Sequence, residues 1–254
     1  MRQAEFNGHK VELFDSIEEL PVARFHKYNK MLMLEGGIGS GMEAVDRHLL
    51  RISAYIGRGD TANAQKEIDN ARQSLRLTQE DLSPGSMAFA ALVKSIDGKE
   101  EADISDDGLK RTAARLAEFT TVKAAETTMD SAKKKISAEL ELYFPGTFSC
   151  MDEGETTGLL QQRALLILGN IKGENNDAEI ANIDTELVLW NKPETFTGTA
   201  NAEIRQDLQF EEMALLLQSE LAVDAKKLTV MEFYSASAYL QKRAKARAAA
   251  YKKK

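Results

Sequence analysis

Apolar residues recur every three or four positions over much of this chain, and no other feature constrains its fold as strongly. The clearest stripe contains Met42, Val45, Leu49, Ile52 and Ile56. This spacing places the side chains on one face of an α-helix. The chain of 254 residues contains only four prolines and 7% aromatic residues, and this composition also favours helix over sheet. We therefore predict a mainly α fold, a multi-helix bundle.

The first fifteen residues are the exception to this pattern. Asn7-Gly8 lies between two short segments that alternate apolar and polar residues. Both residues accept the positive φ angles of a type I′ turn, so this dipeptide predicts a small β-hairpin ending near Phe14. An isolated hairpin is marginally stable in water, and we expect this one to lie on a helix or on a partner chain.

The remaining segments show helical spacing and recognisable helix ends. Pro21 suits a first helical position, and the last helix begins with Thr229 and Glu232 arranged as a capping box. We expect three parts: a hairpin arm over 1–15, a helical core domain over 16–192, and a C-terminal helical pair with a basic tail over 200–254. Six other helices are expected. One is capped by Asp60 with Leu75 facing inward, one covers Met87–Ile96, and a long one starts at Ser105 or Asp106 and runs to about Tyr143 with a kink or break near Thr120-Thr121. The remaining three are a buried Leu159–Ile171, one capped by Asn176, and one over about Asn201–Ala222.

The long pattern that ends at Tyr143 is rich in alanine. Small side chains allow a neighbouring helix to approach closely. We expect this face to contact a partner side by side.

Glycines 36, 37, 39 and 41 form the segment that most resembles a nucleotide-binding loop. No Gly-Lys-Ser/Thr follows them, and Met42 occupies the position of the third glycine in a dinucleotide fingerprint. The simpler interpretation is a connection between two helices. In it, Gly36 ends the first helix in a left-handed cap, and Ser40 caps the second with Glu43. We predict no cofactor here.

No catalytic or metal-binding constellation emerges from the reactive residues. His9, His26 and His48 are scattered and form neither an i, i+4 pair nor an HExxH motif. The single cysteine, Cys150, excludes an internal disulfide, and no cation near it in sequence would lower its pKa. We therefore expect a protein that is not an enzyme and holds no metal.

Positive charge is concentrated at the C-terminus. The formal net charge is −7, and it becomes −14 when the seven cations of the tail are left out. This tail can be a solvated helix end, a contact for an acidic partner, or a contact for phosphate. No apolar run reaches the ~18–20 residues of a membrane span, and the first ten residues lack the apolar core of a signal peptide. The cations are Lys242, Arg243, Lys245, Arg247, Lys252, Lys253 and Lys254.

A set of residues in the first fifth of the chain carries a resemblance to a known family. These residues are Phe14, Ile17, Leu20-Pro21, Arg24-Phe25, Asn29-Lys30 and Gly37-Ile38-Gly39-Ser40. The segment that contains them is similar to the N-terminal part of virion structural proteins of crAss-like podovirus phages, and nothing from Ala62 onward adds to the likeness. The resemblance implies a virion structural protein, such as a ring protein of the head-to-tail connector at the portal vertex, assembled in the host cytoplasm beside portal or tail components, and it does not fix which component.

Two function classes follow from the sequence. The first is a non-enzymatic assembly protein that contacts copies of itself and neighbouring virion proteins. The second is a nucleic-acid-associated or ejected cargo protein that acts through its basic tail. For the first class, we predict that partners contact the basic tail and the hairpin residues Phe6, Val11, Leu13 and Phe14.

Overall fold

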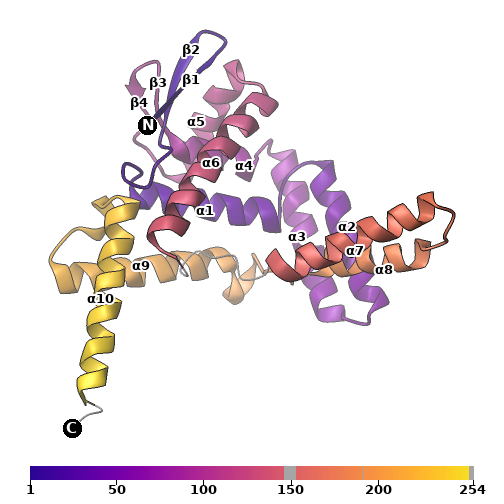
Figure 1. Cartoon of the computed structure of the whole chain (residues 1–254). Coiled ribbons are helices and arrows are strands. Elements are labelled where there is room, and N and C mark those ends of the chain that lie inside the picture. Colours follow the sequence, from indigo (N-terminus) through magenta and orange to yellow (C-terminus); the bar gives the residue numbers. More distant parts are fainter. Residues whose placement is uncertain (146–152, 191, 252–254) are drawn as a thin grey trace. The chain divides into compact units, whose positions relative to one another are not determined.

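The computed structural model describes residues 1–145, 153–190 and 192–251 (Figure 1). These residues are mainly helical, with a small N-terminal hairpin, which confirms the predicted fold class. The chain divides into two compact units. The first contains Met1–Gly36, Leu82–Phe148 and Glu203–Lys254, and the second contains Gly37–Asp81 and Ser149–Ala202. The consecutive parts predicted at 1–15, 16–192 and 200–254 do not match this division, because each unit combines segments that are far apart in sequence.

The first unit contains a four-stranded antiparallel sheet in the order β1-β2-β3-β4. Its strands are β1 (Arg2–Phe6), β2 (His9–Leu13), β3 (Val93–Ile96) and β4 (Lys99–Glu100). Asn7 and Gly8 form the predicted turn, with φ angles of 48° and 86°. The hairpin is not a separate arm, because β2 also pairs with β3 and places Val11 opposite Ile96.

The second hairpin of this sheet differs from the sequence prediction. The helix expected over Met87–Ile96 is α4 (Pro84–Leu92), and it ends where β3 begins. Asp97 and Gly98 have φ angles of 53° and 78°, so a tight turn joins β3 to β4. Asp-Gly is the same kind of turn signal as Asn-Gly. Pairing with β2 converts the β-branched end of the expected helix into a strand.

Four helices supply most of the core of the first unit: α1 (Val22–Gly37), α4, α5 (Asp106–Phe119) and α6 (Val122–Tyr143). The predicted break between α5 and α6 falls at Thr120-Thr121, where the Thr121 hydroxyl accepts a hydrogen bond from the Ala124 amide at 3.3 Å. On α6, the stripe that contains Ala132, Ile136 and Leu140 is buried in this core. The stripe therefore packs within its own unit, and the partner contact expected along it is wrong.

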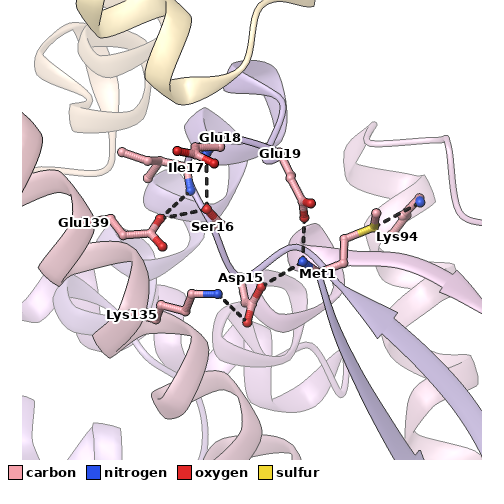
Figure 2. Close-up of polar contacts among 9 residues, drawn as sticks. All are labelled: Met1, Asp15, Ser16, Ile17, Glu18, Glu19, Lys94, Lys135 and Glu139. Atoms are coloured by element: carbon pink, nitrogen blue, oxygen red, sulfur yellow. Dashed lines mark hydrogen bonds and ion pairs between the residues drawn. The ribbon is translucent and has the colours of Figure 1, made fainter.

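The loop between β2 and α1 is fixed against α6 (Figure 2). Glu139 accepts hydrogen bonds from the Ser16 hydroxyl at 3.0 Å and from the Ile17 amide at 2.8 Å. Lys135 Nζ lies 3.1 Å from an Asp15 carboxylate oxygen. Burial favours the neutral acid, but Lys135 and the chain's terminal amino group offset burial and lower the pKa of Asp15. This loop in turn holds the C-terminal helix described below.

The second unit contains α2 (Met42–Gly57), α3 (Thr61–Gln79), α7 (Glu153–Ile171), α8 (Asp177–Leu189) and the short 3-10 helix η1 (Gly198–Ala200). Helix α2 packs on α3 and α8, and α7 packs on α8. As predicted, the Asp60 side chain caps α3, accepting a hydrogen bond from the Asn63 amide at 3.1 Å. Asn176 precedes α8, but its side chain makes no capping hydrogen bond.

The interface between α2 and α3 combines apolar and polar residues. Val45 on α2 is buried as predicted, and Ala64 and Ala71 on α3 are also buried. His48 and Glu67 are completely buried there and lie 2.6 Å apart, from Nδ1 to Oε2. Met42, Leu49 and Ile56, which we expected on one packing stripe, are each more than half exposed. Two more expectations of buried apolar faces are wrong in the same way: Leu75 on α3 and Leu160, Leu165, Leu168 and Ile171 on α7 are exposed.

The glycine segment joins α1 to α2, but not through the predicted caps. Helix α1 continues through Gly36 and ends at Gly37, so Gly36 is not a left-handed cap. Gly41, with a φ of 85°, precedes α2 in place of Ser40 and donates its amide hydrogen to Thr78 Oγ1 at 2.8 Å. A Cβ atom on Gly37 would lie 2.4 Å from the Phe196 ring, which is why that position requires glycine.

Candidate functional site

A groove of about 340 Å³ lies between the last two helices of the first unit, α9 (Ala202–Leu221) and α10 (Val230–Tyr251). Its floor is apolar and its edge is charged. A groove of this kind accepts an amphipathic helix, whose apolar face enters the groove while its charged residues meet the edge. The floor contains Met213, Leu216 and Leu217 from α9 and Leu240 and Ala244 from α10.

The two helices are joined by a small core at one end of the groove. Ala214 and Leu217 of α9 pack against Phe233 of α10, together with Val22 and Ala225. Ala225 belongs to the 3-10 helix η2 (Ala225–Lys227), which precedes α10. Side-chain packing in this core therefore joins the two helices.

Backbone hydrogen bonds fix the start of α10 to the segment before α1. The Val230 amide donates to the Leu20 carbonyl at 2.9 Å, and the Met231 amide donates to the Ile17 carbonyl at 2.9 Å. The predicted capping box is present, because the Glu232 amide donates to Thr229 Oγ1 at 3.3 Å and the Thr229 amide to Glu232 Oε2 at 2.9 Å. The groove is therefore built on a fixed base.

Farther along, α10 continues past α9 (Figure 1). Every residue from Gln241 to Arg247 is exposed. The far end of the groove is consequently open to solvent along α10.

Two arginines give the edge of the groove its positive charge. Arg243 and Arg247 line it together with one acidic residue, Glu220, and Arg243 Nη1 lies 3.6 Å from Glu220 Oε2. Both partners of this ion pair are exposed, and exposed pairs contribute about 0–1 kcal/mol. Arg243 can therefore exchange Glu220 for the carboxylate of a binding partner at little cost.

The basic residues predicted to meet partners fall into three groups. Arg243 and Arg247 line the groove. Lys242 and Lys245 are exposed on α10, and at about 3.6 residues per turn they lie on the side of the helix away from the groove. The predictions for Lys252, Lys253 and Lys254 concern residues outside the part of the chain that the structure describes.

The structure contradicts the prediction that Phe6, Val11, Leu13 and Phe14 contact partners. All four belong to the core of the first unit, and Val11 and Leu13 are completely inaccessible. Pairing of β2 with β3 and packing against the helices bury this face of the hairpin. A partner could reach these side chains only if the unit opened.

The apolar floor of the groove was missed at the sequence level. A signal was present, since Met213-Ala214-Leu215-Leu216-Leu217 is a strongly apolar run and Leu240 and Ala244 share one face of the following helix. The sequence does not show that these two faces meet and leave a hollow between them. That arrangement depends on the fixed start of α10.

A polar cluster joins α1 to α9 near the groove. The two carboxylate oxygens of Asp207 each lie 2.8 Å from a nitrogen atom, one from His26 Nε2 and the other from Lys30 Nζ. Lys30 Nζ also lies 3.4 Å from Glu203 Oε2. The His26 ring stacks on Phe210, with ring centroids 4.2 Å apart. Burial lowers the pKa of His26 despite the opposing effect of Asp207. These contacts connect two helices, which accounts for the cluster structurally.

The histidines do not converge on a metal site. His9 lies 2.8 Å from Asp97, and His26 and His48 contact the carboxylates described above. Within residues 1–145, 153–190 and 192–251, no cluster of three or more histidine, cysteine or acidic side chains is arranged to hold a metal ion. Cys150 lies outside these ranges. None of the described helices is long and apolar enough to cross a membrane.

Comparisons with protein-family models, with curated proteins and with solved structures find no match to this chain.

Proposed function

We propose that this protein is a non-enzymatic structural protein of a phage virion, a ring or adaptor component of the head-to-tail connector. It joins neighbouring subunits through the groove between α9 and α10. The observation that carries the proposal is the combination of an apolar floor and two edge arginines on helices with a fixed base. The resemblance of the first fifth of the chain to virion proteins supports the virion location.

The distribution of charge agrees with an assembly role. The chain has a formal net charge of −7, while the edge of the groove is positive. Complementary charges on two copies, or on this protein and another virion protein, speed association and select the correct partner. Buried apolar contacts on the floor of the groove then supply most of the binding free energy.

A pair of double variants tests this proposal. Arg243→Glu/Arg247→Glu changes the edge of the groove, whereas Lys242→Glu/Lys245→Glu makes the same change in net charge on the other side of α10. In sedimentation velocity experiments over a range of concentrations, we expect wild-type protein and the lysine variant to form assemblies. The arginine variant should be mainly monomeric. Equal assembly of all three proteins would contradict a role for the groove.

The same proteins test the alternative, a nucleic-acid-associated or ejected cargo protein. Binding to phosphate depends on the number of cations and falls steeply with salt. Both double variants would then lose affinity for duplex DNA by similar amounts. Under the assembly proposal, DNA binding at moderate salt is negligible in every form.

A further inference from the structure

Helix α9 carries an exposed apolar stripe with acidic residues beside it. Ile204, Leu208 and Leu215 are 51%, 57% and 63% exposed, and their spacing of four and seven residues places them on one side of the helix. Glu211 and Glu212 lie between them in sequence and are both exposed. Glu211 also forms an exposed ion pair with Lys226, 2.8 Å apart.

This stripe lies on the side of α9 opposite to the groove. At about 3.6 residues per turn, Met213 and Leu217 on the floor of the groove point nearly opposite to Leu208 and Leu215. One copy of α9 therefore cannot place its own stripe in its own groove. A second copy can.

We propose that the groove between α9 and α10 binds the exposed stripe of α9 from a second copy of this chain. The inference rests on the proposed function and names the partner of the same site. The apolar side chains of the stripe cover the floor of the groove. Glu211 and Glu212 approach Arg243 and Arg247 at its edge.

Charge selects this stripe over the other exposed apolar faces. On α7, the residues next to the exposed leucines include Gln161, Gln162 and Arg163, none of which brings a carboxylate to an arginine edge. The exposed residues of α2 are flanked by charges of both signs, among them Asp46 and Arg47. On α9, Arg205 follows Ile204 at one end of the stripe, whereas two consecutive glutamates and no cation lie between Leu208 and Leu215.

A contact between two different surfaces repeats from copy to copy. Each subunit in such a series offers a free groove at one end and a free stripe at the other. The series closes into a ring when the rotation between neighbours permits, and otherwise continues as a filament.

Three double variants of the full chain test the inference. Arg243→Glu/Arg247→Glu disables the groove, and Leu208→Gln/Leu215→Gln disables the stripe. Leu165→Gln/Leu168→Gln on α7 removes two leucines of similar exposure and serves as the control. Because all these side chains are exposed, circular dichroism should show the same helix content in each. The first two variants should weaken self-association by about tenfold or more, and the control should not.

A mixture of the groove variant and the stripe variant gives the deciding measurement. One intact groove and one intact stripe remain, so an equimolar mixture should form a heterodimer. The heterodimer should grow no further, because both of its free surfaces are disabled. Sedimentation velocity and mass photometry distinguish this dimer from monomers and from larger assemblies.

Other outcomes overturn the inference and show what replaces it. If the stripe variant assembles like wild type while the groove variant does not, the groove has another occupant and the proposed function stands. If neither variant assembles and their mixture remains monomeric, the two surfaces are not partners. If the wild-type chain is monomeric at every concentration, the self-docking inference fails. The proposed function also fails if that chain then binds no portal or tail protein.

Discussion

His48 is the residue whose surroundings differ most from what its sequence position indicates. Its Nε2 lies 2.8 Å from the Ile38 carbonyl oxygen, and its Nδ1 lies 2.6 Å from Glu67 Oε2. A carbonyl oxygen only accepts hydrogen bonds, so Nε2 carries a hydrogen. Arg51 Nη1 lies 3.0 Å from the other Glu67 oxygen. The buried ring therefore bridges the Ile38 carbonyl group and the Glu67 carboxyl group.

Removing this ring should strongly destabilise the second unit. We expect His48→Ala to lower its free energy of unfolding by about 3–5 kcal/mol, because it removes one partner of a buried ionic group and leaves Glu67 short of a hydrogen-bond donor. Urea denaturation, with hydrogen exchange as the readout for the second unit, measures the decrease in the free energy of unfolding.

His9→Ala is the matched control, since His9 and Asp97 form an exposed pair. Its effect should be below about 1 kcal/mol. Similar effects of the two substitutions would show that the pair between His48 and Glu67 has no special role.

Among the helices, α10 shows most clearly how the contacts of the first turn fix the position of a helix. The capping box at Thr229 and Glu232 satisfies amide hydrogens that the first turn leaves without partners in the helix. The same turn is bonded to Leu20 and Ile17. Local sequence and tertiary contact therefore stabilise one helix start, and this start positions the groove.

The Thr229→Ala variant should lower the free energy of unfolding by about 1 kcal/mol, the usual cost of losing a side-chain cap. Amide hydrogens in the first turn of α10 should exchange faster as a result. Thermal unfolding and hydrogen exchange measure the two effects.

Thr127→Ala provides the control for this substitution. The Thr127 hydroxyl bonds to the Lys123 carbonyl within α6, so it caps nothing. This variant should be as stable as wild type or slightly more stable, because alanine favours helix. A larger loss at Thr127 than at Thr229 would contradict the capping explanation.

At the scale of the whole molecule, the chain alternates between two compact units. Neither unit is one continuous stretch of the chain. Each forms only when segments that are far apart in sequence pack together. Each has a distinct set of buried residues: an apolar core around Leu92 in the first, and the polar pair of His48 and Glu67 in the second. Compact units with their own buried residues can unfold separately.

Substitutions in the two units should therefore have separate effects. Leu92→Ala should cost about 2–5 kcal/mol and increase hydrogen exchange in the first unit, because Leu92 is completely buried. His48→Ala should increase exchange mainly in the second unit. Peptide-resolved hydrogen exchange with mass spectrometry compares the units in each variant. Equal increases throughout the chain for either variant would show that the molecule unfolds as one cooperative unit.

The features that the sequence determined by itself depend on neighbouring residues. The hairpin turn at Asn7-Gly8, the break at Thr120-Thr121 and the capping box at Thr229 all appear where predicted. Helix periodicity, turn geometry and capping involve contacts within a few positions along the chain. These features can therefore be predicted without knowledge of the fold.

Which faces are buried and which segments meet depends on contacts between distant parts of the chain. Pairing of β2 with β3 buried Val11 and Leu13, while the packing of α2 left Leu49 exposed and enclosed His48. The groove at Arg243 exists because α10 is bonded to a segment about two hundred residues earlier in the chain. An amphipathic pattern shows that a helix has an apolar face, but burial of that face depends on the area and charge that distant segments offer to it.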